Sequence, residues 1–128
     1  MANQKAVNVY GESLQTCSLQ PLTGFLRDGD CRIGPGDIGR HGVCAQVTDA
    51  FLEFTRRRGN DLSTPQPTAG FPGLKPGDRW CLCVDRWEEA KESGVAPPVI
   101  LAATHSKVLN HVPLAQLASH ALENQRDR

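Results

Sequence analysis

Apolar and polar residues alternate in two short segments of the chain, Gly42–Val47 and Arg79–Val84. A period of two residues is typical of a β-strand that buries one of its faces. The two segments align with each other without a gap, and each runs directly into a helical pattern. The sequence therefore predicts two copies of one strand–helix unit. The apolar face of the two strands is expected to carry Val43, Ala45, Val47, Trp80, Leu82 and Val84.

Three segments show the spacing of apolar residues that a helix requires. Thr48 is suited to cap the first helix, and Asp85, with Glu88 three residues later, is predicted to cap the second. The third helix is expected after Pro113, because proline favours the first turn of a helix. A nearly continuous apolar run at Val99–Thr104 predicts a third strand, in the centre of the sheet.

The two tryptophans are predicted to be buried. Trp80 lies on the apolar face of the second strand, and Trp87 points inward by its place in the second helix.

Glycine and proline interrupt the pattern in long connections. The chain holds 12 Gly and 9 Pro, and four of the prolines lie within Gly59–Gly77. A chain of 128 residues is long enough for one domain. We therefore expect a single α+β domain over residues 1–128, with frayed tails at 1–5 and 123–128. It is predicted to be a two-layer sandwich, with about three helices on one side of a small sheet and long Gly/Pro-rich loops; a three-layer α/β arrangement is the alternative.

Charge and cysteine content limit the classes of partner and the cellular location that the sequence favours. Basic and acidic residues balance at 14 each, so nothing favours nucleic acid or an anionic membrane as a partner. No long apolar run indicates a transmembrane helix, and the first five residues do not resemble a secretory leader. Five cysteines are an odd number, which we interpret as reduced thiols in a cytoplasmic protein with no intramolecular disulfide.

The second face of the two strands carries thiols. Cys44, Cys81 and Cys83 share it if the strands run in the same direction. In one interpretation these three cysteines are core residues, because a buried cysteine behaves as a small hydrophobic residue. The other is a thiol site, in which Cys83 lies near a helix N-terminus and His105, at the end of the third strand, approaches Cys81 or Cys83. These three are the candidate catalytic residues.

Metal and nucleotide chemistry have little support in the pattern. One Cys-x-Cys and one His-x-x-Cys, His41 to Cys44, differ from the paired knuckles of a structural zinc site, so no metal ligand is assigned. No glycine-rich nucleotide-binding motif is present, and the cofactor stays unknown.

A pocket is predicted between the thiols and the long loop. Asn60 and Asp61 begin the loop, and their polar groups are of the kind that orient a ligand. The predicted ligand-binding residues are Cys44, Asn60, Asp61 and His41. In the competing interpretation, Asn60 and Asp61 only form local turns that cap the first helix.

Long motifs spread over nearly the whole chain resemble those of the bacterial proteins grouped as domain of unknown function family 2237. The resemblance implies a single small α+β domain, a two-layer sandwich, and it implies no activity. Pro113 stands where a serine-like helix cap is expected in relatives. The motifs are Cys17-Ser18, Pro21–Phe25, Arg27–Gly29, Gly34-Pro35, His41 with Val43–Ala45, Gly59–Pro65, Phe71–Asp78 and Trp80–Cys83.

Two hypotheses for the function follow. The first is a cytoplasmic protein that binds a small molecule, or a small enzyme, with a cysteine-lined pocket beside the 59–77 loop. The alternative is a non-catalytic interaction or metal-binding module in which the cysteines are structural. The sequence leaves open whether the protein is an enzyme and how it associates.

Overall fold

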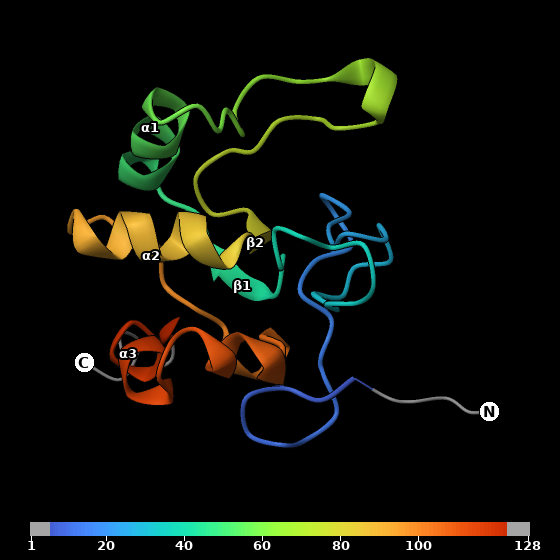
Figure 1. Cartoon of the computed structure of the whole chain (residues 1–128). Helices are drawn as coiled ribbons and strands as arrows, with labels where there is room; N and C mark the ends of the chain where they lie inside the picture. The colour runs from blue at the N-terminus through green and yellow to red at the C-terminus, as the bar shows by residue number, and fades with distance from the viewer. Residues whose placement is uncertain (1–5, 123–128) are drawn as a thin grey trace.

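The computed structural model describes residues 6–122, so the predicted frayed tails lie outside the described residues. It has the predicted α+β architecture, with a two-stranded antiparallel sheet and three α-helices. Figure 1 shows the three helices along one side of the molecule and the long loops along the other. The elements in chain order are β1 Val43–Gln46, α1 Asp49–Arg57, a 3₁₀ turn Pro67–Ala69, β2 Arg79–Leu82, α2 Val84–Glu92, two 3₁₀ turns Leu101–Ala103 and Ser106–Asn110, and α3 Leu114–Ser119.

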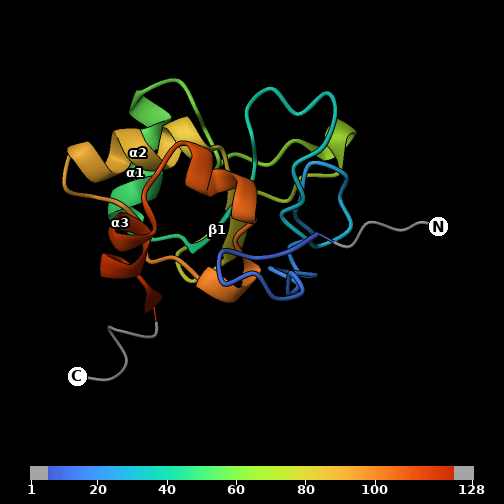
Figure 2. The ribbon, with the colours of Figure 1, turned by 60° about the horizontal axis from the view of Figure 1, so that its bottom comes forward.

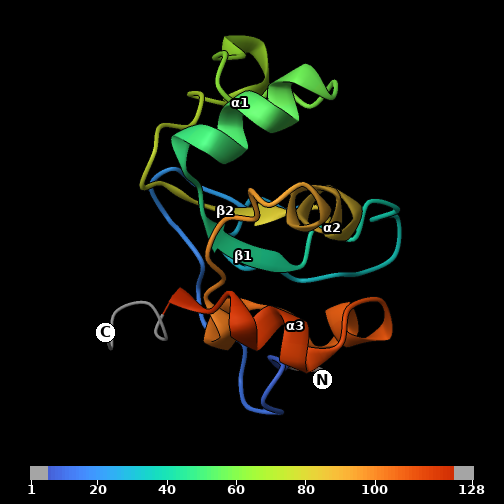
Figure 3. The ribbon, with the colours of Figure 1, turned by 90° about the vertical axis from the view of Figure 1, so that its left-hand side faces the viewer.

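The two predicted strands form, and they run antiparallel. In their register Val43 lies opposite Leu82, and Cys44 lies opposite Cys81. Residues directly opposite each other in a ladder present their side chains on the same face. The two cysteines therefore share one face, although the strands do not run in the same direction. The sheet lies at mid-height between α1 and α3 (Figure 3).

The predicted third strand, Val99–Thr104, does not form. Val99 makes single bridges to Ala45 and Ala121, and the next residue, Ile100, donates its N–H to the Cys44 carbonyl at 2.8 Å. The chain then turns into a 3₁₀ helix. An unbroken apolar run shows that a segment is buried, but it does not distinguish a strand from another buried segment.

The start of α1 follows the local capping rules, and the start of α2 does not. Thr48 caps α1 as predicted, since its hydroxyl accepts the N–H of Phe51 at 3.1 Å. α2 begins at Val84, so its cap is Cys83 and not Asp85, and Cys83 makes no side-chain cap bond. The N–H of Val84 instead donates to the carbonyl of Arg40 at 3.2 Å, which accounts for the earlier start of the helix.

The apolar face of the sheet forms the main core. The six predicted residues of that face all belong to one buried cluster, which the helices cover. Trp87 is 0 % exposed and Trp80 is 6 % exposed, so both predicted burials are confirmed. The indole N–H of Trp87 donates to the Pro97 carbonyl at 3.2 Å, which satisfies its one polar group.

The opposite face forms a second, smaller cluster built on cysteine. Two disulfides join Cys17 to Cys44 and Cys31 to Cys81, and Cys83 is the one free cysteine in the described residues. The prediction of no intramolecular disulfide is therefore wrong. The bonded pairs are 27 and 50 residues apart in sequence, so only the fold reveals them. An odd count requires only that one cysteine stays unpaired.

The N-terminal segment lies against the 101–110 region, and Figure 2 shows the two side by side. Val9 donates its N–H to the Thr104 carbonyl at 3.0 Å, and Gln15 donates to Ala102 at 3.0 Å. Val7 and Asn8 form isolated bridges to Ser13 and His105. These bonds hold the segment that leads to Cys17 beside the cysteine cluster.

Candidate functional site

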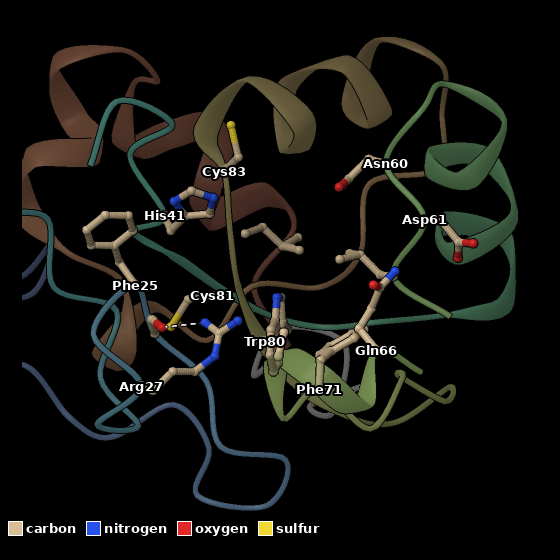
Figure 4. Close-up of a pocket in the computed structure, with 14 residues that line it drawn as sticks. Phe25, Arg27, His41, Asn60, Asp61, Gln66, Phe71, Trp80, Cys81 and Cys83 are labelled. Carbon is tan, nitrogen blue, oxygen red and sulfur yellow. Dashed lines mark hydrogen bonds between the residues drawn. The ribbon is translucent and has the colours of Figure 1, made fainter. Parts of the chain in front are cut away.

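A pocket of about 670 Å³ lies between β2 and the long loop that follows α1. Figure 4 shows Trp80 in its middle, with Phe25, Arg27, His41 and Cys83 on one side. Asn60, Asp61 and Gln66 lie on the other side in this view. The lining residues are Gly24, Phe25, Arg27, His41, Asn60, Asp61, Leu62, Gln66, Ala69, Phe71, Trp80, Cys81, Leu82 and Cys83.

Aromatic rings and one arginine form the base of the pocket. Phe71 meets Trp80 edge to face, with 5.2 Å between ring centroids. The Arg27 guanidinium lies over the Trp80 ring, 5.1 Å from its centroid, which is a cation–π geometry. Nη1 of Arg27 also donates to the Gly24 carbonyl at 2.6 Å, so the guanidinium is held from two directions. The pocket thus combines flat apolar surface with a positioned positive charge.

The turn that precedes β1 supplies an imidazole held by a buried carboxylate. Nδ1 of His41 lies 2.6 Å from Oδ1 of Asp37, whose side chain is fully buried. The backbone N–H of His41 donates to the other oxygen of Asp37 at 3.0 Å. The His41 ring stacks on Phe25, with centroids 6.0 Å apart, and its side chain is 38 % exposed. No bond joins Nε2 to another described residue, so that nitrogen is free to meet a ligand or a proton.

The free thiol of Cys83 lines the same pocket. It lies at the N-terminus of α2, where the helix dipole favours negative charge. The bond from Val84 N–H to the Arg40 carbonyl joins the segment of Cys83 to the segment of His41. Figure 4 shows the two side chains at the same end of the pocket. A thiol and a carboxylate-bound imidazole therefore share one wall.

The opposite wall uses most of its polar groups locally. The Asp61 carboxylate accepts the N–H groups of Ser63 and Thr64 and the Thr64 hydroxyl, at 2.9, 3.2 and 2.7 Å. The Thr64 hydroxyl, followed by the Ser63 N–H, lowers the pKa of Asp61 below its ordinary value. The Asn60 amide donates to the Thr55 hydroxyl at 3.1 Å. The hydrogen bonds of both residues are those of local turns, as the competing interpretation expects.

A comparison with models of protein families finds a match over residues 7–121, to a family described as "Uncharacterized protein conserved in bacteria (DUF2237)". The chain belongs to this family. The match spans the whole pocket and all five cysteines of this DUF2237 protein. No match was found among curated proteins. No described helix is long and apolar enough to cross a membrane.

The structure of this DUF2237 protein separates the predicted site residues into two groups. Five of them line the pocket: His41, Asn60, Asp61, Cys81 and Cys83. The other two, Cys44 and His105, lie elsewhere. Cys44 is fully buried and bonded to Cys17, so it presents no surface to a ligand.

The candidate catalytic residues are separated as well. Cys81 is bonded to Cys31 and offers no free thiol in this structure. His105 lines a different hollow with Lys107, and burial, followed by the charge of Lys107, lowers its pKa. Of the two candidate thiols Cys83 is the free one, and the histidine that lines the same pocket is His41 and not His105.

Sequence reasoning missed the pocket roles of Arg27 and Trp80, and also that of Asp37, which holds His41 from outside the lining. Arg27 and Asp37 lie in an irregular loop where no period constrains side-chain direction, so no pattern signals their roles. Strand alternation places Trp80 in the core, which the structure confirms, and the same residue also lines the pocket with Arg27 over its ring. The four-residue spacing from Asp37 to His41 is the one local signal, and it has meaning only once the turn is known.

Proposed function

We propose that this protein binds a small organic anion with an apolar body, in the pocket between β2 and the 59–77 loop. The observation that carries the proposal is the Arg27 guanidinium placed over Trp80 in a pocket of about 670 Å³. Ligand sites typically have volumes of roughly 300–1,000 Å³, with apolar walls and a few positioned polar groups. This pocket has both properties.

The charges around the pocket favour an anion. Arg27 is a fixed cation, and guanidinium groups bind carboxylates and phosphates through paired hydrogen bonds. The one acid that lines the pocket, Asp61, directs both of its oxygens into its own turn. His41 adds a ring nitrogen that either donates or accepts a hydrogen bond. A ligand with a ring and a carboxylate or phosphate matches these groups.

Benzoate and phenyl phosphate are the minimal probes for this proposal. We expect both to shift the backbone amide NMR signals of residues 24–27, 41 and 80–83 in a saturable way. The variant Arg27→Gln is expected to weaken binding about tenfold or more, because it removes a charge-assisted hydrogen bond. Arg57→Gln, which changes an exposed arginine on α1 away from the pocket, is the matched control and should leave binding unchanged.

Two results would contradict the proposal. One is that neither probe shifts the signals of the pocket residues at millimolar concentration. The other is that Arg27→Gln and Arg57→Gln affect binding equally, because the effect would then reflect total charge and not the pocket.

A thiol-dependent enzyme is a second candidate function for the same pocket. The observation that favours it is the short contact of 2.6 Å between Asp37 and His41 on the wall that also carries Cys83. A carboxylate that holds an imidazole, with a free thiol nearby, is the arrangement that activates cysteine nucleophiles. In such a reaction Nε2 of His41 would take the thiol proton, and the thiolate would add to a carbonyl carbon of the ligand, whose C=O π electrons move to the oxygen.

The rate of alkylation of Cys83 by iodoacetamide tests this second candidate. In His41→Gln and in Asp37→Asn we expect the rate at neutral pH to fall several-fold, because the thiol loses its base or the base loses its support. His111→Gln is the control, since His111 does not line the pocket. Equal rates in all four proteins would exclude an activated thiol and leave simple ligand binding.

We propose a cytoplasmic location as part of this function. Buried groups of cysteines in reducing compartments more often serve as metal ligands or in catalysis than as disulfide frameworks. A cytoplasmic location therefore requires that the four paired cysteines have a second, reduced state. Alkylation of the protein in acid-quenched cells tests the location: blocked thiols at Cys17, Cys31, Cys44 and Cys81 would support it, and intact bridges would contradict it.

A further inference from the structure

The four bridged cysteines come from β1, β2 and the N-terminal loop and meet in one buried cluster. Cys44 and Cys81 lie opposite each other on β1 and β2, and Cys17 and Cys31 reach them from the N-terminal loop. All four are almost fully buried. Two independent bridges would not have to touch each other, so their common location requires an explanation.

The sulfurs of different bridges are close together. Sγ of Cys17, which belongs to one bridge, lies within 4.8 Å of Sγ of both Cys31 and Cys81, which form the other. Sγ of Cys44 is bonded to Sγ of Cys17 at 2.05 Å. In a tetrahedral zinc–thiolate centre with Zn–S bonds of about 2.3 Å, neighbouring sulfurs are about 3.8 Å apart. Three of the four sulfurs, those of Cys17, Cys31 and Cys81, therefore lie within 4.8 Å of one another, and the fourth, of Cys44, is bonded to Cys17.

Backbone hydrogen bonds hold three of the four cysteines, Cys17, Cys44 and Cys81, independently of the bridges. The N–H of Cys44 donates to the Thr104 hydroxyl at 3.2 Å, and the N–H of Cys81 donates to the Thr23 hydroxyl at 2.9 Å. The N–H of Cys17 donates to the Gly29 carbonyl at 2.8 Å, which ties the two sides of the N-terminal loop together. These three hydrogen bonds involve backbone N–H groups and do not require the bridges.

We propose that the reduced protein binds one Zn²⁺ ion through Cys17, Cys31, Cys44 and Cys81. Each disulfide takes two electrons and two protons from a dithiol reductant, which leaves as its own disulfide. The zinc ion then displaces the four thiol protons and forms four Zn–S bonds. Thiolate ligands in a tetrahedral arrangement select zinc among the common divalent ions.

This site differs from the anion pocket in chemistry and in test, although Cys81 borders both. Ligand binding in the pocket depends on Arg27, His41 and Trp80. The zinc site is formed by the four buried cysteines of β1, β2 and the N-terminal loop. The free cysteine, Cys83, lines the pocket and lies outside the cluster, so it gives a matched control for every cysteine variant.

The experiment uses the full chain, reduced and supplied with Zn²⁺, and then freed of unbound metal by gel filtration. Elemental analysis is expected to give one zinc per chain in the reduced protein and none in the oxidised protein. Co²⁺ in place of Zn²⁺ is expected to give the strong ultraviolet thiolate-to-cobalt bands and the visible bands of tetrahedral sulfur coordination. X-ray absorption of the zinc form is expected to show four sulfur neighbours, a readout that needs no variant.

Serine variants assign the ligands. Each of Cys17→Ser, Cys31→Ser, Cys44→Ser and Cys81→Ser is expected to lose tight zinc binding, with the cobalt bands weakened or shifted. Cys83→Ser is expected to keep one zinc and an unchanged cobalt spectrum. Circular dichroism of the oxidised and reduced variants separates lost binding from lost folding.

Three results would overturn the proposal. The first is a folded, reduced wild-type protein that retains no zinc after gel filtration. The second is a zinc centre with fewer than three sulfur neighbours. The third is a cobalt spectrum that depends on Cys83, which would place the metal in the pocket and not in the cluster.

Discussion

The two faces of the small sheet are built in different ways. On one face the strand residues Val43, Ala45, Trp80 and Leu82 pack under the helices, and the main core consists of apolar contacts. On the other face Cys44 and Cys81 are bonded to cysteines of the N-terminal loop, and the second cluster has few apolar members. A two-stranded sheet is marginal by itself, so each face needs its own cover.

The difference shows how the protein positions its pocket. Helices fix β2 from one side, and bridged loops fix it from the other. The turn at residues 23–27 receives the N–H of Cys81 at Thr23 and supplies Arg27 to the pocket. The cysteine face therefore places the cation of the pocket, while the apolar face places the Trp80 ring.

Opening both bridges in metal-free buffer is the change with the largest expected effect. Closed loops of 27 and 50 residues predict a loss of about 3–4 kcal/mol of unfolding free energy per bridge. Urea unfolding with and without a dithiol reductant measures it. Cys83→Ser is the control, because it should lose as much on reduction as the wild type. An unchanged urea midpoint on reduction would mean that the cysteine face contributes no stability.

Trp87→Ala removes the α2 side chain that packs in the main core, on the apolar side of the sheet. The side chain is 0 % exposed, and its removal should cost about 3–5 kcal/mol, because a large cavity is left in the core. Ile38→Ala is the comparison, since Ile38 is 88 % exposed and its removal should change stability by less than about 0.5 kcal/mol. Thermal unfolding of the oxidised proteins gives both values. A small loss in Trp87→Ala would place the core elsewhere.

Much of the apolar face could be predicted from the sequence, because strand alternation and helix period are local. Those patterns indicated both strands, all six residues of the apolar face and the burial of Trp80 and Trp87. The prediction of a third strand at 99–104 was wrong, because an apolar run indicates burial but does not indicate backbone conformation. The predicted cap of the first helix, Thr48, is confirmed. The predicted cap of the second, Asp85, is wrong, because a carbonyl from the distant Arg40 sets the start of α2.

The cysteine face and the pocket depended on distant contacts. The count of five cysteines gave no information on which of them meet in space. The prediction of reduced thiols at Cys44 and Cys81 was therefore wrong, since both are bridged. The long loop and the second strand suggested where a pocket would lie. Arg27 and Asp37 come from a loop without periodicity, so no sequence pattern placed them beside it.

Thr23→Val sharpens the comparison at the level of one hydrogen bond. Thr23 is fully buried, and its hydroxyl accepts the N–H of Cys81 at 2.9 Å. Valine has nearly the same shape but leaves that N–H unpaired, so we expect a loss of about 1–3 kcal/mol. Thr16→Val, at an exposed position, should be neutral. Equal stability of the two variants would mean that the hydroxyl does not hold β2.

The pH dependence of stability gives the smallest expected effect. Burial lowers the pKa of His105 below its ordinary value of 6.5, with a further contribution from Lys107. The unfolded chain therefore binds a proton before the folded protein does, and stability should fall as pH decreases through 6.5 toward the lowered pKa. His105→Asn should remove this part of the decline in urea unfolding between about pH 8 and pH 5. The same decline in both proteins would assign it to other groups.

The most direct test of the contrast between the two faces is a disulfide map of the protein after oxidation in metal-free buffer. Alkylation under denaturing, non-reducing conditions followed by peptide mass spectrometry identifies every free and bridged cysteine. The structure predicts one alkylated residue, Cys83, and two linked peptide pairs, Cys17 with Cys44 and Cys31 with Cys81. Five alkylated cysteines, or a bridge that includes Cys83, would contradict the account of the cysteine face.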